Sequence, residues 1–282
     1  MKLLRYGPKG REKPGLLDAR GRIRDLSAVV ADIAGDVLSP RGLARLKKLK
    51  PESLPLVKGR PRLGPPVARP QKFIAIGLNY SDHAAETGAA IPREPIIFSK
   101  AVSCLSGPHD AITLPPRSQK TDWEVELGLV IGTTAKNVAK TAALSHVAGY
   151  VLVNDVSERA FQVERGGQWT KGKSYDSFGP VGPWLATSDE IPDPQKVSLW
   201  LEVNGKRMQQ GSTATMVFGV AEIVSYVSHF MTLHPGDIIT TGTPPGVGMA
   251  RRPPRFLKPG DEVTLGGDGL GEQAQTVTRD RT

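Results

Sequence analysis

From about residue 70 onward, short apolar segments with the composition of β-strands alternate with polar turns. Val, Ile, Leu and aromatic residues fill the segments, and Gly, Pro, Asn and Asp separate them, which is typical of strands joined by turns. Asn204-Gly205 is a hairpin signal. The expected strands span 72–80, 95–103, 123–132, 149–157, 181–188, 198–205, 236–243 and 261–267.

Four segments have the pattern of helices. In residues 216–231, Val217, Val220, Val224 and Val227 recur at helical spacing, so this helix is expected to pack on the sheet. Strands outnumber helices without regular alternation, which disfavours a doubly wound sheet and predicts a strand-rich α+β fold. The other expected helices span 81–88, 143–150 and 157–167.

The first part of the chain differs from the rest. Two short strand-like segments bend at Arg20-Gly21, and Ser39-Pro40 supplies an N-cap and a first helical residue for a following helix. Six prolines within 51–70 indicate a linker. We therefore predict a small N-terminal domain over residues 1–68, which includes this linker, and a larger domain over residues 69–282.

The net charge of +9 is concentrated in the first quarter of the chain. Up to Lys72 there are 18 Lys and Arg against 6 Asp and Glu, whereas the remainder has 19 against 22. A basic patch can bind phosphates, but the aromatic residues that stack on bases are missing between these basic residues. A solvated surface is favoured over a nucleic-acid partner, and a non-catalytic basic binding protein is the alternative of a different class.

Cysteine content and hydropathy bear on the compartment. The single cysteine, Cys104, has no internal disulfide partner, so a reducing cytoplasm is expected and the thiol is interpreted as a small buried apolar group. The start of the sequence has no apolar region of a signal peptide, and no apolar run approaches the roughly 18 residues that span a membrane. We expect a cytoplasmic protein with no membrane partner.

Two glutamates occupy alternate positions of the expected strand 123–132. Residues i and i+2 of a strand point to the same face, so Glu124 and Glu126 share one face and Trp123 and Val125 the other. If partly buried, two carboxylates roughly 6–7 Å apart repel by about 3 kcal/mol at an effective dielectric near 20. Exposure to water, protonation of one carboxyl group or a cation between them relieves this repulsion. E-x-E alone favours an exposed strand face.

Asp155 adds a third carboxylate where the expected strand 149–157 gives way to a helix. Functional groups are common at such positions, although an Asp there can equally be a helix cap. No cysteine or histidine cluster accompanies the three carboxylates. A metal site formed by them would suit a hard cation with oxygen ligands, Mg²⁺ or Mn²⁺ before Zn²⁺.

Four motifs in this order resemble the fumarylacetoacetate hydrolase family, and the resemblance covers roughly residues 70–282. It implies a mixed β-roll or sandwich with a small N-terminal β-containing domain, a homodimer, and Mg²⁺ or Mn²⁺ as cofactor. The motifs are E-V-E at 124–126, N-D-V-S-E-R-A-F-Q at 154–162, K-G-K-S-Y-D-S-F-G-P at 171–180 and T-G-T-P-P-G-V-G at 241–248.

Positions that match the family's motifs receive roles from the resemblance. Three carboxylates would bind the metal, a His–Glu pair on a short lid helix would act as the general base and its orienting partner, and a lysine would stabilise negative charge. The metal ligands are Glu124, Glu126 and Asp155, the catalytic residues are His83, Glu86 and Lys173, and the substrate-binding residues are Arg159, Gln162 and Thr243.

The reaction implied by the resemblance begins with a 2-oxo acid that chelates the metal through a carboxylate and its keto oxygen. Water would then attack the distal carbonyl of a 2,4-dioxo acid, and the carbon–carbon bond would break to give pyruvate. Ser212, where the family usually has Asn, favours a sugar-acid substrate such as 2,4-diketo-3-deoxy-L-fuconate. The alternatives are a ureidoglycolate lyase, a hydroxyheptadienedioate isomerase or a 2-oxo acid decarboxylase that uses the same site.

Overall fold

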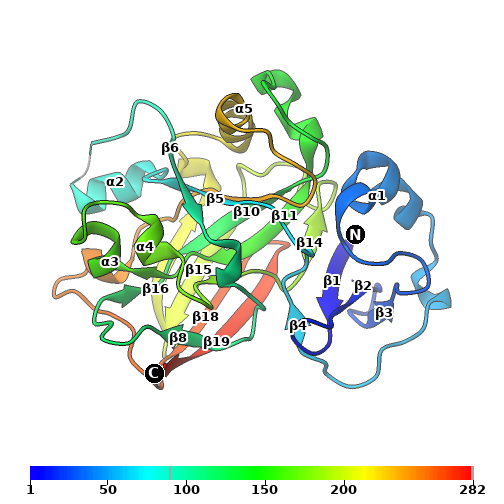
Figure 1. Ribbon diagram of the computed structural model, residues 1–282, viewed down its shortest axis with the longest axis horizontal. Helices are drawn as coiled ribbons and strands as arrows, with labels where there is room; N and C mark the ends of the chain where they lie inside the picture. Colours follow the sequence, from blue (N-terminus) through cyan, green and yellow to red (C-terminus); the bar gives the residue numbers. More distant parts are fainter. Residues whose placement is uncertain (89, 281–282) are drawn as a thin grey trace.

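A large, mostly antiparallel sheet runs through the protein (Figure 1). The computed structural model describes residues 1–88 and 90–280. The strands of this sheet are β1 (Lys2–Tyr6), β2 (Lys13–Leu17), β3 (Ile23–Asp25), β4 (Leu63–Gly64), β5 (Phe73–Gly77), β6 (Ile96–Lys100), β10 (Val125–Ile131), β11 (Val147–Asn154), β14 (Leu185–Thr187) and β17 (Ile238–Thr240). Their order is β3-β2-β1-β14-β11-β10-β17-β5-β6, with β4 paired to β1. This order places β10 and β11 at the centre, where both faces are covered.

A second sheet of five strands lies beside β10 and β11, and the buried face between the two sheets is the main core. Its strands are β8 (Ile112–Leu114), β15 (Ser198–Val203), β16 (Lys206–Ser212), β18 (Glu262–Gly267) and β19 (Gly271–Arg279). The order is β16-β15-β18-β19-β8. Two small strand pairs complete the β-structure: β9 (Thr121–Asp122) with β12 (Ser157–Glu158), and β7 (Leu105–Ser106) with β13 (Gly179–Pro180).

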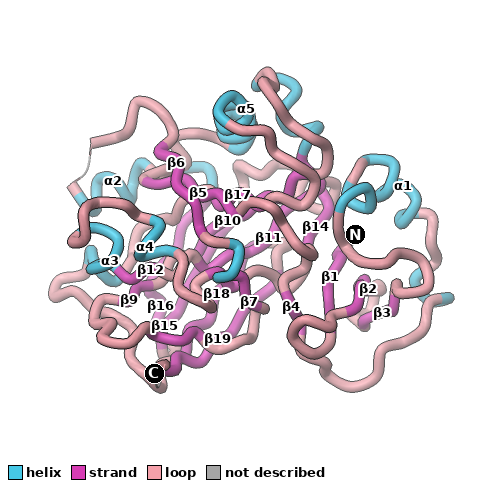
Figure 2. The backbone as a smooth tube through the Cα atoms, viewed as in Figure 1, coloured by secondary structure: helices cyan, strands magenta, loops and turns pink. Residues whose placement is uncertain are grey.

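Helices lie around the edges of the sheets, and most of the connecting chain is loop (Figure 2). The α-helices are α1 (Pro40–Lys47), α2 (Ser81–Thr87), α3 (Arg159–Val163), α4 (Thr170–Lys173) and α5 (Val220–Phe230). Short 3₁₀ helices span Gly35–Leu38, Pro51–Ser53, Val102–Cys104, Lys140–His146, Thr213–Thr215 and Gly248–Ala250. The strand-rich α+β fold predicted from the sequence is confirmed, with helices shorter than expected.

The expected helix 143–150 is wrong. A 3₁₀ helix ends at His146, and β11 begins at the next residue and is buried along its whole length. The apolar run from Val147 suits a central strand covered on both faces, and this tertiary setting overrides the local helical pattern. The expected helix 157–167 shrinks to α3, because the two residues before Arg159 pair with β9. The strand β19 had no counterpart in the prediction, since its buried positions include polar Gln273 and Gln275.

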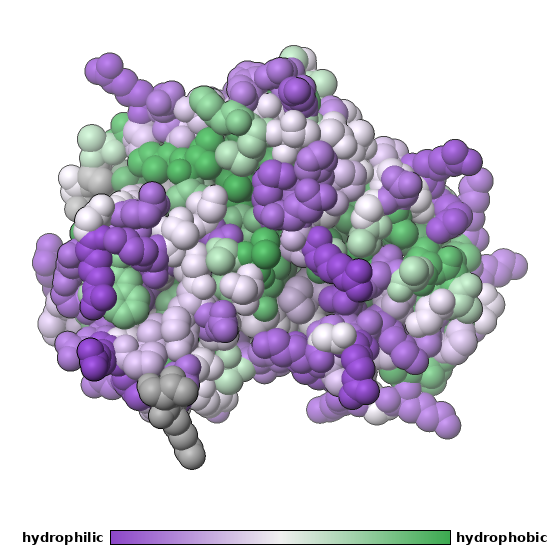
Figure 3. Space-filling model, in the orientation of Figure 1, coloured by the Kyte–Doolittle hydropathy of each residue, from purple (hydrophilic) through white to green (hydrophobic). Residues whose placement is uncertain are grey.

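The N-terminal region shares the large sheet. Strand β1 pairs antiparallel with β14, and Leu3 and Leu4 are buried in the core. Arg62 also reaches across to Asp110 with an ion pair of 2.6 Å. The division into domains at residue 68 stays a prediction. In Figure 3, hydrophilic side chains are spread over the visible face of both the N-terminal region and the larger body.

The expectation that Cys104 is a small buried apolar group agrees with its complete burial and its free thiol. Burial also raises the pKa of this thiol to about 11, which removes the thiolate that a nucleophile needs. None of the helices in the described part of the chain is long and apolar enough to cross a membrane.

Asp237, at the entry to β17, holds the chain segment before β5 to the sheet. Its carboxylate accepts hydrogen bonds from the backbone N–H groups of Gln71, Lys72 and His234 and from the Lys72 Nζ. Replacing Asp237 with Ala would leave these donors unpaired, so we expect the free energy of unfolding to fall by roughly 2–4 kcal/mol. Urea unfolding measures this change, and Asp36→Ala at an exposed position serves as the control, with an expected change below about 0.5 kcal/mol. Equal effects of the two substitutions would contradict this role for Asp237.

Candidate functional site

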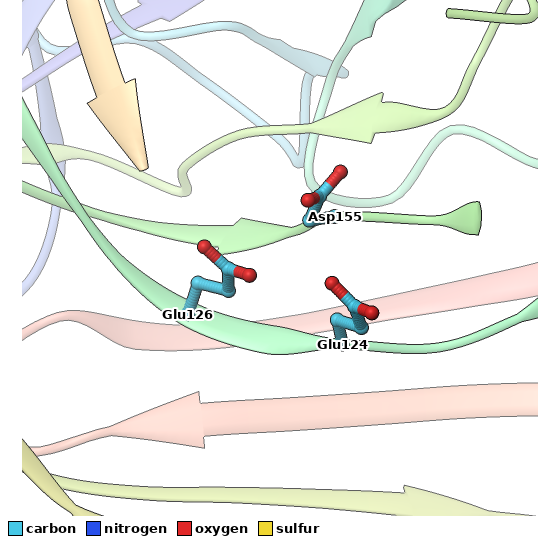
Figure 4. A group of neighbouring side chains, drawn as sticks. All are labelled: Glu124, Glu126 and Asp155. Atoms are coloured by element: carbon cyan, nitrogen blue, oxygen red, sulfur yellow. The ribbon is translucent and has the colours of Figure 1, made fainter. Parts of the chain in front are cut away.

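Three carboxylates converge where β10 and β11 meet. Glu124 lies directly before β10, Glu126 lies within it, and Asp155 directly follows β11. The two strands are antiparallel, and the Asp155 N–H donates to the Glu124 carbonyl at 2.9 Å, so the start of one strand adjoins the end of the other. The alternation of a strand turns both glutamates to one face, as predicted. Figure 4 shows the three side chains around one common space, and one oxygen of each lies within 4.8 Å of the others.

Cationic side chains surround this acidic triad, which we define as Glu124, Glu126 and Asp155. The Lys173 Nζ lies 2.7 Å from an oxygen of Glu124 and 2.7 Å from an oxygen of Asp155. Lys100 Nζ lies 2.5 Å from the other oxygen of Asp155. Burial without partners would be very costly for each of these charges, so their mutual pairing is what allows so many ionised groups inside the protein.

The two glutamates differ in their affinity for a proton. Burial opposes ionisation of Glu124, but the Lys173 ammonium and the Arg159 guanidinium overcome it and lower its pKa to about 2. Burial together with the negative charges of Asp155 and Glu124 raises the pKa of Glu126 well above its ordinary value. The basic neighbours therefore offset the negative charge of the triad less at Glu126 than at Glu124. An additional cation beside Glu126 would be stabilised.

The donor set of the triad fits a hard divalent cation. All three groups are buried carboxylates, and no thiolate or imidazole belongs to this cluster among the described residues. One oxygen of Glu126 already accepts from the Thr240 hydroxyl at 2.5 Å and the Gly242 N–H at 2.8 Å, which fixes the orientation of the carboxylate. Oxygen ligands held in this way suit Mg²⁺ or Mn²⁺ rather than Zn²⁺.

The predicted His–Glu pair lies on α2 above the triad. His83 Nδ1 is 3.1 Å from a carboxylate oxygen of Glu86, and the two residues are three positions apart, which is about one helical turn. The same carboxylate accepts the Gly246 N–H at 3.0 and 3.1 Å. Glu86 therefore joins the helix to the loop 241–248 and orients the imidazole, which is buried and lines the same cavity as Glu124 and Glu126.

Arg159 connects the triad to a carboxylate that sequence reasoning missed. Its Nη1 lies 2.6 Å from Glu124, and its Nε donates to Asp122 at 2.9 Å. Asp122 is completely buried and also accepts the backbone N–H groups of Gly248 and Met249 at 2.6 and 2.9 Å. The Asp122 carboxylate thus binds both the Arg159 guanidinium and the turn at the end of the T-G-T-P-P-G-V-G motif.

A cavity of about 180 Å³ opens onto these groups. Seven of the nine predicted site residues line it, while Glu86 and Asp155 support it from behind. Gln162 accepts from Arg159 at 3.0 Å. The Thr243 hydroxyl donates to the Val125 carbonyl at 2.9 Å, and its contact with substrate stays a prediction. The lining residues are Ile76, Gly77, Leu78, His83, Phe98, Glu124, Glu126, Arg159, Gln162, Val163, Trp169, Lys173, Gly242, Thr243 and Met249.

Sequence reasoning found the charged residues of the cavity and missed its apolar ones. Asp122 precedes Trp123 and the E-V-E motif. Its proximity to this motif in the sequence was the signal that could have identified it as part of the site. Phe98, Trp169 and Met249 belong to three separate segments that only tertiary packing brings together, and no local pattern marks them.

Known proteins resemble this chain over most or all of its length. The family model described as fumarylacetoacetate (FAA) hydrolase C-terminal matches residues 72–278. A protein of Burkholderia ambifaria (strain MC40-6), provisionally named a hydrolase with no stated substrate, is 65% identical over 98% of this chain and 99% of its own.

Two solved structures cover both chains almost completely. The maleylpyruvate hydrolase of Sphingobium sp. SYK-6, crystallised with manganese(II) and pyruvate, is 30% identical with a TM-score of 0.83, covering 100% of each chain. The 2-hydroxyhepta-2,4-diene-1,7-dioate isomerase of Mycobacterium marinum is 32% identical with a TM-score of 0.75, also over 100% of each chain. The matched motifs, the shared fold and the family model together show that this chain belongs to the fumarylacetoacetate hydrolase family.

Proposed function

We propose that the protein is a divalent-metal-dependent hydrolase that cleaves a carbon–carbon bond of 2,4-dioxo acids and releases pyruvate. The observation that carries this proposal is the buried triad of Glu124, Glu126 and Asp155, whose two glutamates line one cavity together with His83 of the His83–Glu86 pair. A fold neighbour that binds manganese and pyruvate supports it. A homodimer, as the family resemblance implies, is part of the proposal.

The triad residues Glu124, Glu126 and Asp155 would hold Mg²⁺ or Mn²⁺. Bound there, the cation would supply a Lewis acid that orients the 2-oxo acid and stabilises negative charge on its keto oxygen. Lys173 and Arg159 keep Glu124 ionised, so this ligand is already deprotonated before a cation arrives.

His83 would act on the water that attacks the distal carbonyl. With Glu86 at its Nδ1, the imidazole is held in the tautomer that carries a proton there, and Nε2 is the atom that takes a proton from water. Addition of the hydroxide to the C4 carbonyl followed by cleavage of the C3–C4 bond gives a carboxylic acid and the enolate of pyruvate. Protonation of the enolate at C3 completes the reaction.

Lys173 would supply positive charge where the enolate develops. Its Nζ is completely buried between two carboxylates, which raises its pKa and keeps it protonated even though burial favours the neutral amine. Arg159 and Gln162, joined to each other at 3.0 Å, would orient the distal half of the substrate.

An isomerase is the second candidate, because one of the fold neighbours carries that activity in its name. It would use the same cation and enolate without attack by water, and a ureidoglycolate lyase or 2-oxo acid decarboxylase would differ in the bond that breaks. Release of pyruvate from acylpyruvates at a higher kcat/KM than isomerisation of hydroxyheptadienedioate, urea release or CO₂ release favours the hydrolase. The reverse order would favour the corresponding alternative.

Removal of the metal tests the proposal directly. Incubation with EDTA is expected to abolish pyruvate release from acetylpyruvate, and Mg²⁺ or Mn²⁺ should restore it, because no side chain replaces the Lewis acid. A coupled lactate dehydrogenase assay measures the pyruvate. Turnover that persists in EDTA would remove metal dependence from the mechanism.

Glu126→Gln tests the metal ligand separately from catalysis. The amide oxygen still accepts from Thr240 and Gly242, and a repulsive buried carboxyl group disappears, so the metal-free variant should melt at or above the wild-type temperature. Millimolar Mg²⁺ should raise the Tm of the wild type but not that of the variant, because ligand binding stabilises the folded state.

The matched control for this substitution is Glu222→Gln. Its carboxylate pairs with Lys140 on the surface of α5, so the increase in Tm with Mg²⁺ should equal that of the wild type. An equal Mg²⁺-dependent increase for Glu126→Gln would show that Glu126 is not a ligand.

His83→Ala tests the general base. We expect kcat to fall by about 10²–10⁴-fold, the usual contribution of a positioned base, while the Mg²⁺-dependent increase in Tm persists. Steady-state kinetics with acetylpyruvate measures the first effect and thermal melting the second. A kcat within threefold of the wild type would exclude His83 as the base.

A further inference from the structure

The cavity has two chemically different parts. The charged part is lined by His83, Glu124, Glu126, Arg159 and Lys173, whereas the remaining wall is formed by side chains from separate segments of the chain. In Figure 3, hydrophobic surface gathers over β6, the strand that contributes Phe98 to this wall. We define the apolar wall as Ile76, Leu78, Phe98, Val163, Trp169 and Met249.

Specific contacts between side chains form the apolar wall. Trp169 meets Phe98 edge to face with ring centroids 5.3 Å apart. A Cβ at Gly77 would lie 2.3 Å from the Trp169 ring, so the absence of a side chain there is what lets the indole occupy this position. Lys173 Nζ lies 5.2 Å from the centre of the Phe98 ring, which places the aromatic pair directly beside the charged part.

Two members of the apolar wall are exposed although they are large and hydrophobic. Val163, the last residue of α3, is 47% exposed, and Met249 is 40% exposed. Asp122 holds the backbone N–H of Met249 at 2.9 Å, which fixes this residue beside the cavity. Apolar side chains held at the edge of a concave site gain free energy when an apolar ligand covers them.

The cavity offers no unpaired cation to a second anionic group. Among the described residues that line it, the basic side chains are His83, Arg159 and Lys173. Each is within ion-pair distance of a carboxylate of the protein: His83 of Glu86, and the other two of Glu124. A carboxylate at the far end of a substrate would lose its hydration against the apolar wall without gaining a partner.

We propose that the apolar wall is a subsite for an uncharged hydrocarbon tail on the acyl half of the substrate. This inference rests on the proposed function and deepens it, because it selects alkyl- or aryl-acylpyruvates over dicarboxylates and over the sugar acid that Ser212 suggested. Val163, Trp169 and Met249 are the residues that determine this specificity, whereas the charged part recognises the polar oxygen atoms common to all candidates, at both ends of the dioxo acid.

Two 2-oxo acids of the same size test the subsite without any bond being broken. The tail of 5-methyl-2-oxohexanoate ends in two methyl groups, and that of 2-oxoglutarate ends in a carboxylate. We expect isothermal titration of the Mg²⁺-loaded protein to give at least tenfold tighter binding of the methyl-ended acid, since each buried methylene contributes about fourfold and the carboxylate loses its hydration. Equal or tighter binding of 2-oxoglutarate, or no binding of either acid, would overturn the inference.

Met249→Gln assigns the preference to the wall, because it keeps the length of the side chain and changes its polarity. The affinity for 5-methyl-2-oxohexanoate should fall about fivefold or more relative to that for 2-oxoglutarate. The matched control is Leu144→Gln, an exposed apolar residue of the 3₁₀ helix Lys140–His146, which should leave this ratio unchanged. Indistinguishable ratios for the two variants would show that Met249 does not contact the tail.

The failure of this inference and that of the proposed function have different signatures. Neither test acid has a 4-oxo group, so binding reports the subsite whether or not the protein hydrolyses acylpyruvates. Pyruvate release from acetylpyruvate together with a preference for 2-oxoglutarate would overturn the subsite alone. No pyruvate release together with a preference for 5-methyl-2-oxohexanoate would overturn the hydrolase and retain the subsite.

Discussion

The burial of several like charges within a few ångströms is the constraint on which the rest of this structure depends. Three carboxylates share one space between β10 and β11, and Lys100, Lys173 and Arg159 lie against them. No single ion pair explains this arrangement, because Lys173 bridges Glu124 and Asp155, Glu124 also meets Arg159, and Asp155 also meets Lys100 in a medium that solvates poorly. The two central strands, covered on both faces, supply the rigid frame that such a network needs.

The same network gives chemically identical carboxyl groups different affinities for a proton. Glu124 is kept ionised by its basic neighbours, whereas Glu126 experiences mainly negative ones. Two glutamates two residues apart thus acquire opposite affinities for a proton through their surroundings alone. Around them, hydrogen bonds from Thr240 and Gly242 and the Glu86 bridge to Gly246 fix the orientation of the side chains. The family resemblance and the physics of the site thus support the same chemistry by independent routes.

Strand periodicity and the family resemblance together predicted the charged half of the site. The period of two in a strand placed Glu124 and Glu126 on one face, whereas the resemblance identified His83 and Glu86, whose spacing suits one turn of a helix. The apolar wall escaped prediction because β6, the end of α3 and the turn at Met249 meet only in the folded protein. For the same reason the expected helix at 143–150 is wrong, since the central position of β11 in the sheet is not encoded within those eight residues.

Asp122 holds the turn at Met249 by its backbone, whereas the side chain of Met249 lines the cavity. The carboxylate binds the backbone of Gly248 and Met249 and, on its other side, the guanidinium of Arg159. Hydrogen bonds from backbone N–H groups do not depend on which side chain the residue carries. Substitutions at position 249 can therefore reshape the mouth of the cavity while the charge balance of the interior is left untouched. Through this attachment, the choice of ligand can be altered at one position of the chain without disturbing the buried ion pairs.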